Sequence, residues 1–253
     1  MTGRAEDRRS RHIFLRNRRY YDQKHAAGRS PRRGQKYEGK KVRSMSNNMD
    51  LGYEMFCYQC EQTAGGKGCT KQGVCGKTAE VANLQDLLLY QLKGISVYAK
   101  ALMDAGENPE PRVVRFVENC LFTTLTNVNF DAAVHVDLLK QSQKIKEELR
   151  GRAKKARLAE PKAVQAAFNL PETKSEMLRV AAVAGIMYEQ DLDPDVRSLC
   201  MTILYGLKGI SAYGHQAREL GYASAQVDAF YLEALSALTD DALSAEELPA
   251  TGL

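Results

Sequence analysis

The chain has 253 residues, is 44% hydrophobic and 26% charged, and carries a formal net charge of +5. These values are typical of a globular protein with a substantial core, in one large domain or two small ones. No segment approaches the roughly 20 apolar residues of a membrane span, and residues 1–30 contain no apolar core of signal-peptide length. We therefore expect a cytoplasmic protein without a membrane partner, in a reducing compartment where disulfides are rare.

The positive charge lies at the amino terminus. Residues 1–54 contain 15 Lys and Arg against 6 Asp and Glu, whereas the rest of the chain has 21 against 25. The segment has few aliphatic residues and no sustained period, so it is predicted to be a disordered basic arm. It is a solvated tail, an artefact of a start codon that lies at Met45, Met49 or Met55, or a nucleic-acid-binding arm. We do not expect nucleic acid as a partner.

Residues 55–78 form a glycine-containing loop with four cysteines in the order Cys57-x2-Cys60-x8-Cys69-x5-Cys75. Clustered thiols have three ordinary explanations: a disulfide framework, a zinc site or an iron-sulfur cluster. The reducing compartment argues against disulfides. Structural zinc sites present two close pairs, which the final gap fits poorly. A cluster is larger than one zinc ion and suits irregular gaps better. Nearby lysines could offset the thiolate charge: Lys67, Lys71 and Lys77.

From residue 79 onward the hydrophobic period is helical, and strand signals are nearly absent. Residues 79–152 are predicted to form a first three-helix bundle. The core-facing stripe of its first helix is Leu84, Leu88, Leu92, Ile95, Ala99 and Leu102; the second helix contributes Val113, Val114, Val117, Leu121 and Leu125; the third contributes Val134, Val136, Leu138, Leu139, Ile145 and Leu149.

Residues 153–253 are predicted to form a second, related helical bundle that is truncated at its end. One helix begins near Glu172, and another begins at Pro194 with Asp193 as its N-cap. "LYGLKGISAY" at 204–213 shares eight of ten residues with "LYQLKGISVY" at 89–98, 115 positions earlier. We interpret this as an internal repeat.

Four residues of the repeat invite an explanation. Gly94 and Gly209 lie in mid-helix, where glycine costs roughly 1 kcal/mol against alanine, which predicts a close helix crossing at each. Lys93 and Lys208 are predicted to be solvated lysines beside the packing face.

The sequence gives no reason to assign a catalytic role to the two remaining cysteines or to the histidines. Cys120 and Cys200 lie within apolar helical segments and are predicted to be buried structural thiols. His135 is expected to be a partly buried neighbour of the core, and no histidine of the chain is assigned a catalytic role.

Residues 55–99, "MFCYQCEQTAGGKGCTKQGVCGKTAEVANLQDLLLYQLKGISVYA", closely resemble the amino terminus of the hybrid cluster proteins. This family is also called the hydroxylamine reductases or prismane proteins and is related to nickel-type carbon monoxide dehydrogenases. The resemblance continues through "LYGLKGISAYGHQARELGY" and "EALSALTDDALSAEEL", and so covers Met55 to about Leu248.

The resemblance implies that Cys57, Cys60, Cys69 and Cys75 hold a [4Fe-4S] cluster and that the fold is all-α, opening with two helical bundles. In the family this cluster passes electrons to a hybrid iron-sulfur-oxygen cluster, where hydroxylamine is reduced to ammonia or nitric oxide to nitrous oxide. Ligands of the hybrid cluster come from later domains that are absent from this sequence.

We therefore expect the electron-entry part of a hydroxylamine reductase, an oxidoreductase that is inactive as this chain alone and contains no catalytic residue. Its partners would be a redox donor protein and the missing carboxy-terminal domains or a partner chain. The alternative is a non-enzymatic zinc-binding or redox-sensing module with a nucleic-acid-binding arm.

Overall fold

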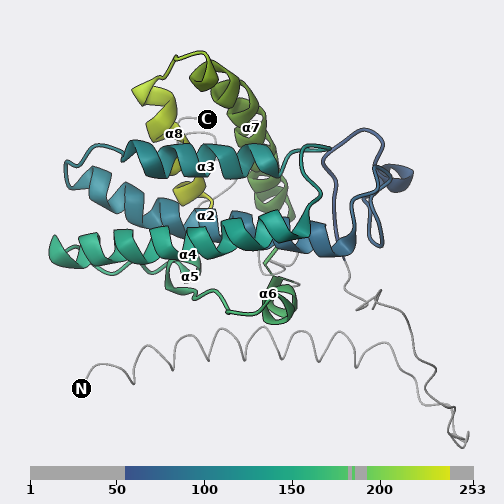
Figure 1. The fold of residues 1–253 in the computed structure, drawn as a ribbon, viewed down its shortest axis with the longest axis horizontal. Coiled ribbons are helices and arrows are strands. Elements are labelled where there is room, and N and C mark those ends of the chain that lie inside the picture. Colours follow the sequence, from purple (N-terminus) through teal and green to yellow (C-terminus); the bar gives the residue numbers. More distant parts are fainter. Residues whose placement is uncertain (1–54, 182–183, 186–192, 240–253) are drawn as a thin grey trace, which may run out of the picture. The chain divides into compact units, whose positions relative to one another are not determined.

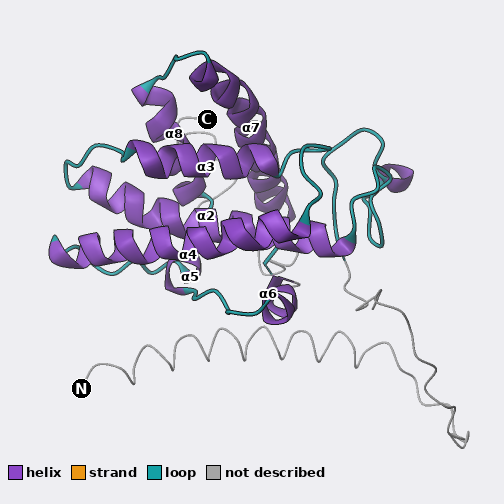
Figure 2. Cartoon of the chain, viewed as in Figure 1, coloured by secondary structure: helices purple, strands orange, loops and turns teal. Residues whose placement is uncertain are grey.

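Helices form the regular secondary structure of this protein, for which a computed structural model describes residues 55–181, 184–185 and 193–239 (Figures 1 and 2). These residues belong to one compact unit, Glu54–Leu253. In order, its elements are a 3-10 turn η1 (Ala64–Gly66) and the helices α2 (Ala79–Asp104), α3 (Pro111–Thr123), α4 (Ala132–Lys155), α5 (Val164–Ala167), α6 (Lys174–Ala181), α7 (Pro194–Glu219) and α8 (Ala225–Ala237). This part of the chain contains no β-strand, so the all-α prediction is confirmed for it. The predicted basic arm lies outside the described residues.

Side chains at the helix starts fix where the longer helices begin. Thr78 accepts a hydrogen bond from the Val81 N–H at the start of α2, and Asp131 accepts one from Ala133 at the start of α4. Asp193 caps α7 and Pro194 is its first residue, as predicted. Such caps satisfy amide groups that a helix leaves unpaired at its first turn.

The repeat found in the sequence extends over two whole helices. Helices α2 and α7 each have 26 residues, and α7 begins and ends 115 positions after α2 does. The two copies differ in their surroundings. The predicted α2 stripe is buried along its length, whereas Ile210, which corresponds to Ile95, is 38% exposed.

Helix α2 is the centre of the packing. It contacts α4, α5, α6 and α8, and more weakly α3, while α3 also contacts α7 and α8 (Figure 1). Helices from both halves of the sequence, including α4 and α8, thus pack against α2. The division at residue 152 into two bundles remains a prediction.

The predicted close crossing is confirmed at Gly94, and among the described residues no such contact is found at Gly209. A Cβ atom placed on Gly94 would lie 2.3 Å from the carbonyl oxygen of Gln165, in the short helix α5. A Cβ atom on Gly209 would have no neighbour within 4 Å among the described residues. The close contact therefore belongs to α2, which α5 crosses, and not to its copy α7.

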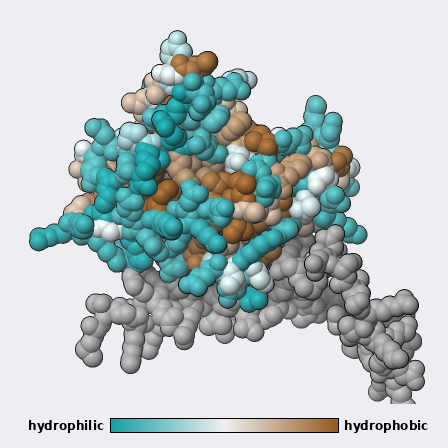
Figure 3. Space-filling model, in the orientation of Figure 1, coloured by the Kyte–Doolittle hydropathy of each residue, from teal (hydrophilic) through white to brown (hydrophobic). Residues whose placement is uncertain are grey.

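The surface is mixed in character. Hydrophilic side chains cover much of the face seen in Figure 3, and hydrophobic side chains gather toward its middle. None of the described helices combines the length and the apolar composition that crossing a bilayer would need.

Candidate metal centre

The cysteine loop begins with a backbone pairing that brings its first and third cysteines together. The Cys57 amide donates to the Cys69 carbonyl at 3.0 Å, and the Cys69 amide donates to the Cys57 carbonyl at 2.9 Å. A tight turn follows around Cys75, where Gly73 donates to the Lys77 carbonyl at 2.8 Å and Gly76 donates to the Gly73 carbonyl at 2.9 Å. Two cysteines distant in the loop are therefore adjacent, and the fourth is held in a turn.

Backbone groups in the glycine turn point at a cysteine sulfur. The turn needs left-handed backbone at Gly65 and Gly66, with φ of 59° and 66°, which glycine adopts without strain. It places the Ala64 amide nitrogen 3.4 Å from Cys69 Sγ, and the Thr63 hydroxyl oxygen lies 3.7 Å from the same sulfur. Hydrogen bonds from backbone amides, Ala64 first, lower the pKa of the Cys69 thiol because they favour the thiolate.

All four loop cysteines are free thiols. Cys69 is buried, and Cys57, Cys60 and Cys75 are half-buried. Among residues 55–181, 184–185 and 193–239, no three His, Cys, Asp or Glu side chains are arranged to hold a metal ion. The ligand set predicted from the sequence therefore stays a prediction.

The donor chemistry of the loop fits an iron-sulfur group. Four thiols lie within 19 residues, none is used in a disulfide, and an amide N–H is directed at one of the sulfurs. Thiolates hold such clusters, and hydrogen bonds to their sulfurs tune them. Partial exposure of three of the four cysteines leaves the loop accessible from solvent.

Lys77 anchors the end of the loop in the helical core. Its side chain is 1% exposed and donates a 2.7 Å hydrogen bond to Gln85 Oε1 on α2. Gln85 in turn lies 3.3 Å from His135 Nε2 and donates to the Asn129 carbonyl. The ammonium also lies 5.9 Å from the centre of the Phe130 ring. A positive charge is thus fixed two residues after Cys75.

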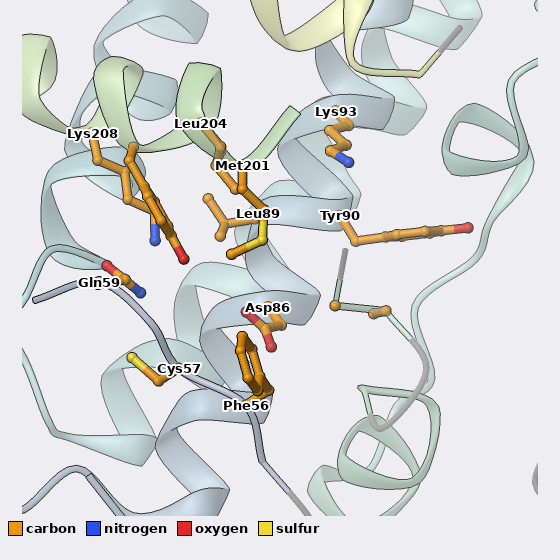
Figure 4. A pocket seen from close by; sticks show the side chains of 13 residues that line it. Phe56, Cys57, Gln59, Asp86, Leu89, Tyr90, Lys93, Met201, Leu204 and Lys208 are labelled. Atoms are coloured by element: carbon orange, nitrogen blue, oxygen red, sulfur yellow. The ribbon is translucent and has the colours of Figure 1, made fainter. Parts of the chain in front are cut away.

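The prediction that Lys93 and Lys208 are solvated is wrong. Lys93 is 4% exposed and Lys208 is 2% exposed, and both line a cavity of about 40 Å³ that also borders Cys57 (Figure 4). The repeat places them beside the packing face, but residues of the cysteine loop and the opposite helix cover that side as well. The cavity is large enough for roughly two or three water molecules.

Asp86 is a residue of this cavity that the sequence analysis did not identify. It lies on α2 one turn before Tyr90, and it is the one carboxylate among the cavity-lining residues that the structure describes. Burial raises the pKa of Asp86 to about 6, against the opposing charges of Lys208, Lys77 and Lys93. Its place on α2, seven residues before the repeated lysine Lys93, was the available sequence signal.

Burial also shifts the pKa values of two other groups that line this cavity, Lys208 and Cys57. It lowers the pKa of Lys208 to about 7, and the nearby Lys77 charge acts in the same direction. It raises the pKa of the Cys57 thiol, while the Lys77 and Lys208 charges oppose that shift. The cavity is therefore poorly solvated, and its described lining contains two lysines, Lys93 and Lys208, and one carboxylate, Asp86.

The two helical cysteines are buried as predicted, whereas His135 is more deeply buried than the partial burial that was predicted. Cys120 is fully buried and Cys200 is 7% exposed, and burial raises the pKa of the Cys120 thiol. His135 is fully buried, with Nδ1 2.7 Å from the Asp131 carbonyl. The His215 ring stacks on Phe122 at 4.8 Å.

Comparison with known proteins shows the family of this chain. Residues 55–252 match the Prismane/CO dehydrogenase family. The chain is 40% identical over 199 residues to a protein named hydroxylamine reductase from Thermoanaerobacter pseudethanolicus, covering 79% of this chain and 36% of that protein. It is 46% identical over 187 residues to one from Syntrophobacter fumaroxidans, covering 72% of this chain and 34% of that protein. The chain thus spans about a third of the length of these relatives.

Proposed function

Because the chain belongs to the Prismane/CO dehydrogenase family, we propose that it is the amino-terminal, electron-entry part of a hydroxylamine reductase. Cys57, Cys60, Cys69 and Cys75 would hold a [4Fe-4S] cluster, which when bound supplies one-electron transfer. The observation that carries this proposal is the loop itself, in which four cysteines lie within 19 residues, none is in a disulfide, and the Ala64 amide points at Cys69 Sγ.

The residues around the thiols have separate tasks in this proposal. The paired backbone of Cys57 and Cys69 fixes two ligands relative to each other, and the glycine turn aims amide hydrogens at sulfur. Lys77 places positive charge near the thiolates and, through Gln85, ties the loop to α2. Cys57, Cys60 and Cys75 are only partly buried, which would let a redox donor protein approach the cluster and transfer electrons to it.

The reaction of the complete protein is a further part of the proposal. Electrons entering at this loop would reach a hybrid iron-sulfur-oxygen cluster held by carboxy-terminal domains or a partner chain, where hydroxylamine is reduced to ammonia or nitric oxide to nitrous oxide. No catalytic residue is assigned to the described part of this chain, and we expect it to be inactive alone. The names of its relatives support this reaction class.

Serine substitutions test the ligand set. Cys75→Ser should lose the visible charge-transfer absorption and the low-temperature electron paramagnetic resonance signal of the reduced protein. The matched control is Cys200→Ser, since Cys200 is buried on α7, outside the cysteine loop, and its substitution should not affect either signal. A normal cluster in Cys75→Ser would show that the assigned ligands are wrong. Zinc in place of iron in the unaltered protein would favour the non-enzymatic binding module instead.

A further inference from the structure

Lys208 is a buried lysine with few hydrogen-bond partners among the described residues. It lies on α7, is 2% exposed, and donates one long hydrogen bond within the described part of the chain, to the Thr124 carbonyl at 3.5 Å. The Tyr205 ring centre is 5.9 Å away. Burying a charge is costly unless it is paired and hydrogen-bonded, so a single long bond does not account for its position.

The cavity next to Lys208 shows which groups lie near its amino group. Cys57 lines the same cavity, and Figure 4 shows the Lys208 side chain extending from α7 toward the side of the cavity where Gln59 and Cys57 lie. Asp86 borders the cavity too, but no hydrogen bond joins it to Lys208 among the described side chains. An anionic group held at Cys57 would supply the missing negative charge.

The internal repeat brings two equivalent lysines to this one place. Lys93 and Lys208 occupy the same position of the repeated "LKGIS" in α2 and α7, and both border the cavity beside Cys57. The cavity is therefore built by both copies of the repeat together with the cysteine loop. A lysine 133 positions after Cys75 thereby reaches the surroundings of the proposed cluster.

We propose that Lys208 is an electrostatic positioning residue that places a buried positive charge beside the Cys57 ligand and so raises the reduction potential of the iron-sulfur group in this loop. This inference rests on the proposed function. Reduction adds a negative charge to the group, and a nearby ammonium in a poorly solvated site stabilises the reduced form more than the oxidised one. The effect is larger than for a surface lysine because solvent and salt screen a buried charge less.

Redox titration of the anaerobically purified full chain, followed by electron paramagnetic resonance, tests the inference. Lys208→Met removes the charge at similar volume, and we expect a potential more negative than that of the unaltered protein at the same iron and sulfide content. Lys208→Arg keeps the positive charge and should have the reduction potential of the unaltered protein. The matched control is Lys146→Met, because Lys146 is also 2% exposed but bonds Gln91 and the Phe168 carbonyl instead of lining this cavity. It should leave the potential unchanged even if it lowers stability.

Each outcome separates this inference from the proposed function. An unaltered protein without iron would refute the proposed function, whereas an iron-loaded Lys208→Met with the original potential would refute only the role of Lys208. If Lys208→Met does not load, Lys208→Gln keeps a donor for the Thr124 carbonyl and removes the charge. Loss of iron in both neutral variants with retention in Lys208→Arg would support the charge requirement. Loss in all three would indicate a purely structural role and overturn the proposal.

Discussion

The pair Gly94 and Gly209 provides an internal test of the fold, because the same substitution at equivalent positions of the repeat should have opposite effects. At Gly94, an alanine Cβ would lie 2.3 Å from the Gln165 carbonyl oxygen and 2.9 Å from its carbonyl carbon, both backbone atoms. That carbonyl also accepts a hydrogen bond from Lys146 at 3.3 Å, so α5 cannot move away without disturbing a buried ammonium.

The expected magnitudes follow from these contacts. Overpacking costs about 1–3 kcal/mol, and the contact with backbone atoms places Gly94→Ala in the upper part of that range, at about 2–3 kcal/mol. Alanine regains about 0.5–1 kcal/mol of helix preference, so the variant should lose about 1–2.5 kcal/mol of unfolding free energy. At Gly209 none of the described residues lies within 4 Å, and Gly209→Ala should gain about 0.5–1 kcal/mol. For a domain of this size each kcal/mol shifts Tm by about 2–4 °C.

Urea titration and thermal unfolding of the two variants beside the unaltered protein would measure both effects. We expect the Tm to fall for Gly94→Ala and to rise for Gly209→Ala. A Gly94→Ala variant as stable as the unaltered protein would mean that α5 does not press against α2. A loss at Gly209 as large as that at Gly94 would mean that α7 has a close neighbour there.

Further predictions concern buried charges. Arg218 donates to the fully buried Glu118 and to Asp228, so Arg218→Met should leave unpaired buried charge and cost about 3–5 kcal/mol in urea unfolding. Arg112→Met breaks only exposed pairs and should cost under about 1 kcal/mol, and equal losses would contradict this account. Burial lowers the pKa of Lys146 from 10.5 to about 7, so the unfolded chain binds more protons between these values and stability should rise with pH across them. Lys146→Met should reduce this rise and leave the part contributed by Lys208, whose pKa burial also lowers to about 7, and an unchanged pH profile in the variant would refute the assignment.

Much of the fold could be predicted from hydrophobic spacing and capping residues. The stripe from Leu84 to Leu102 is buried as predicted, and Asp193 and Pro194 start α7. Local sequence determines where a helix begins and which face is most apolar, so these features were within reach. The 115-residue offset even matched both ends of α2 and α7.

The burial of polar residues could not be predicted in the same way. Periodicity identifies the main face of a helix, but α2 is covered on several sides, and its buried residues include Gln85, Gln91 and Lys93. Which neighbour covers the other faces depends on tertiary packing. The same reason explains why Gly94 contacts α5 while Gly209 has no such contact within the described part of the chain, although their local sequences are nearly identical.

The candidate site was predictable as closely spaced thiols with lysines such as Lys77 nearby, but not as a loop that shares a cavity with α2 and α7. Cysteine spacing in the sequence is sufficient to single out the loop from Cys57 to Cys75. The cavity lysine Lys208 and the carboxylate Asp86 come from two helices that are far apart in sequence. Only the folded chain brings them next to Cys57.

The central claim is that the cysteine loop holds an iron-sulfur cluster through which electrons enter. Anaerobic purification of the full chain, followed by iron, sulfide and zinc analysis and electron paramagnetic resonance of the reduced protein, tests it most directly. We predict about four irons and four sulfides per chain with a low-temperature resonance of the reduced cluster. Stoichiometric zinc without iron, or a chain that binds neither metal, would contradict the electron-entry function.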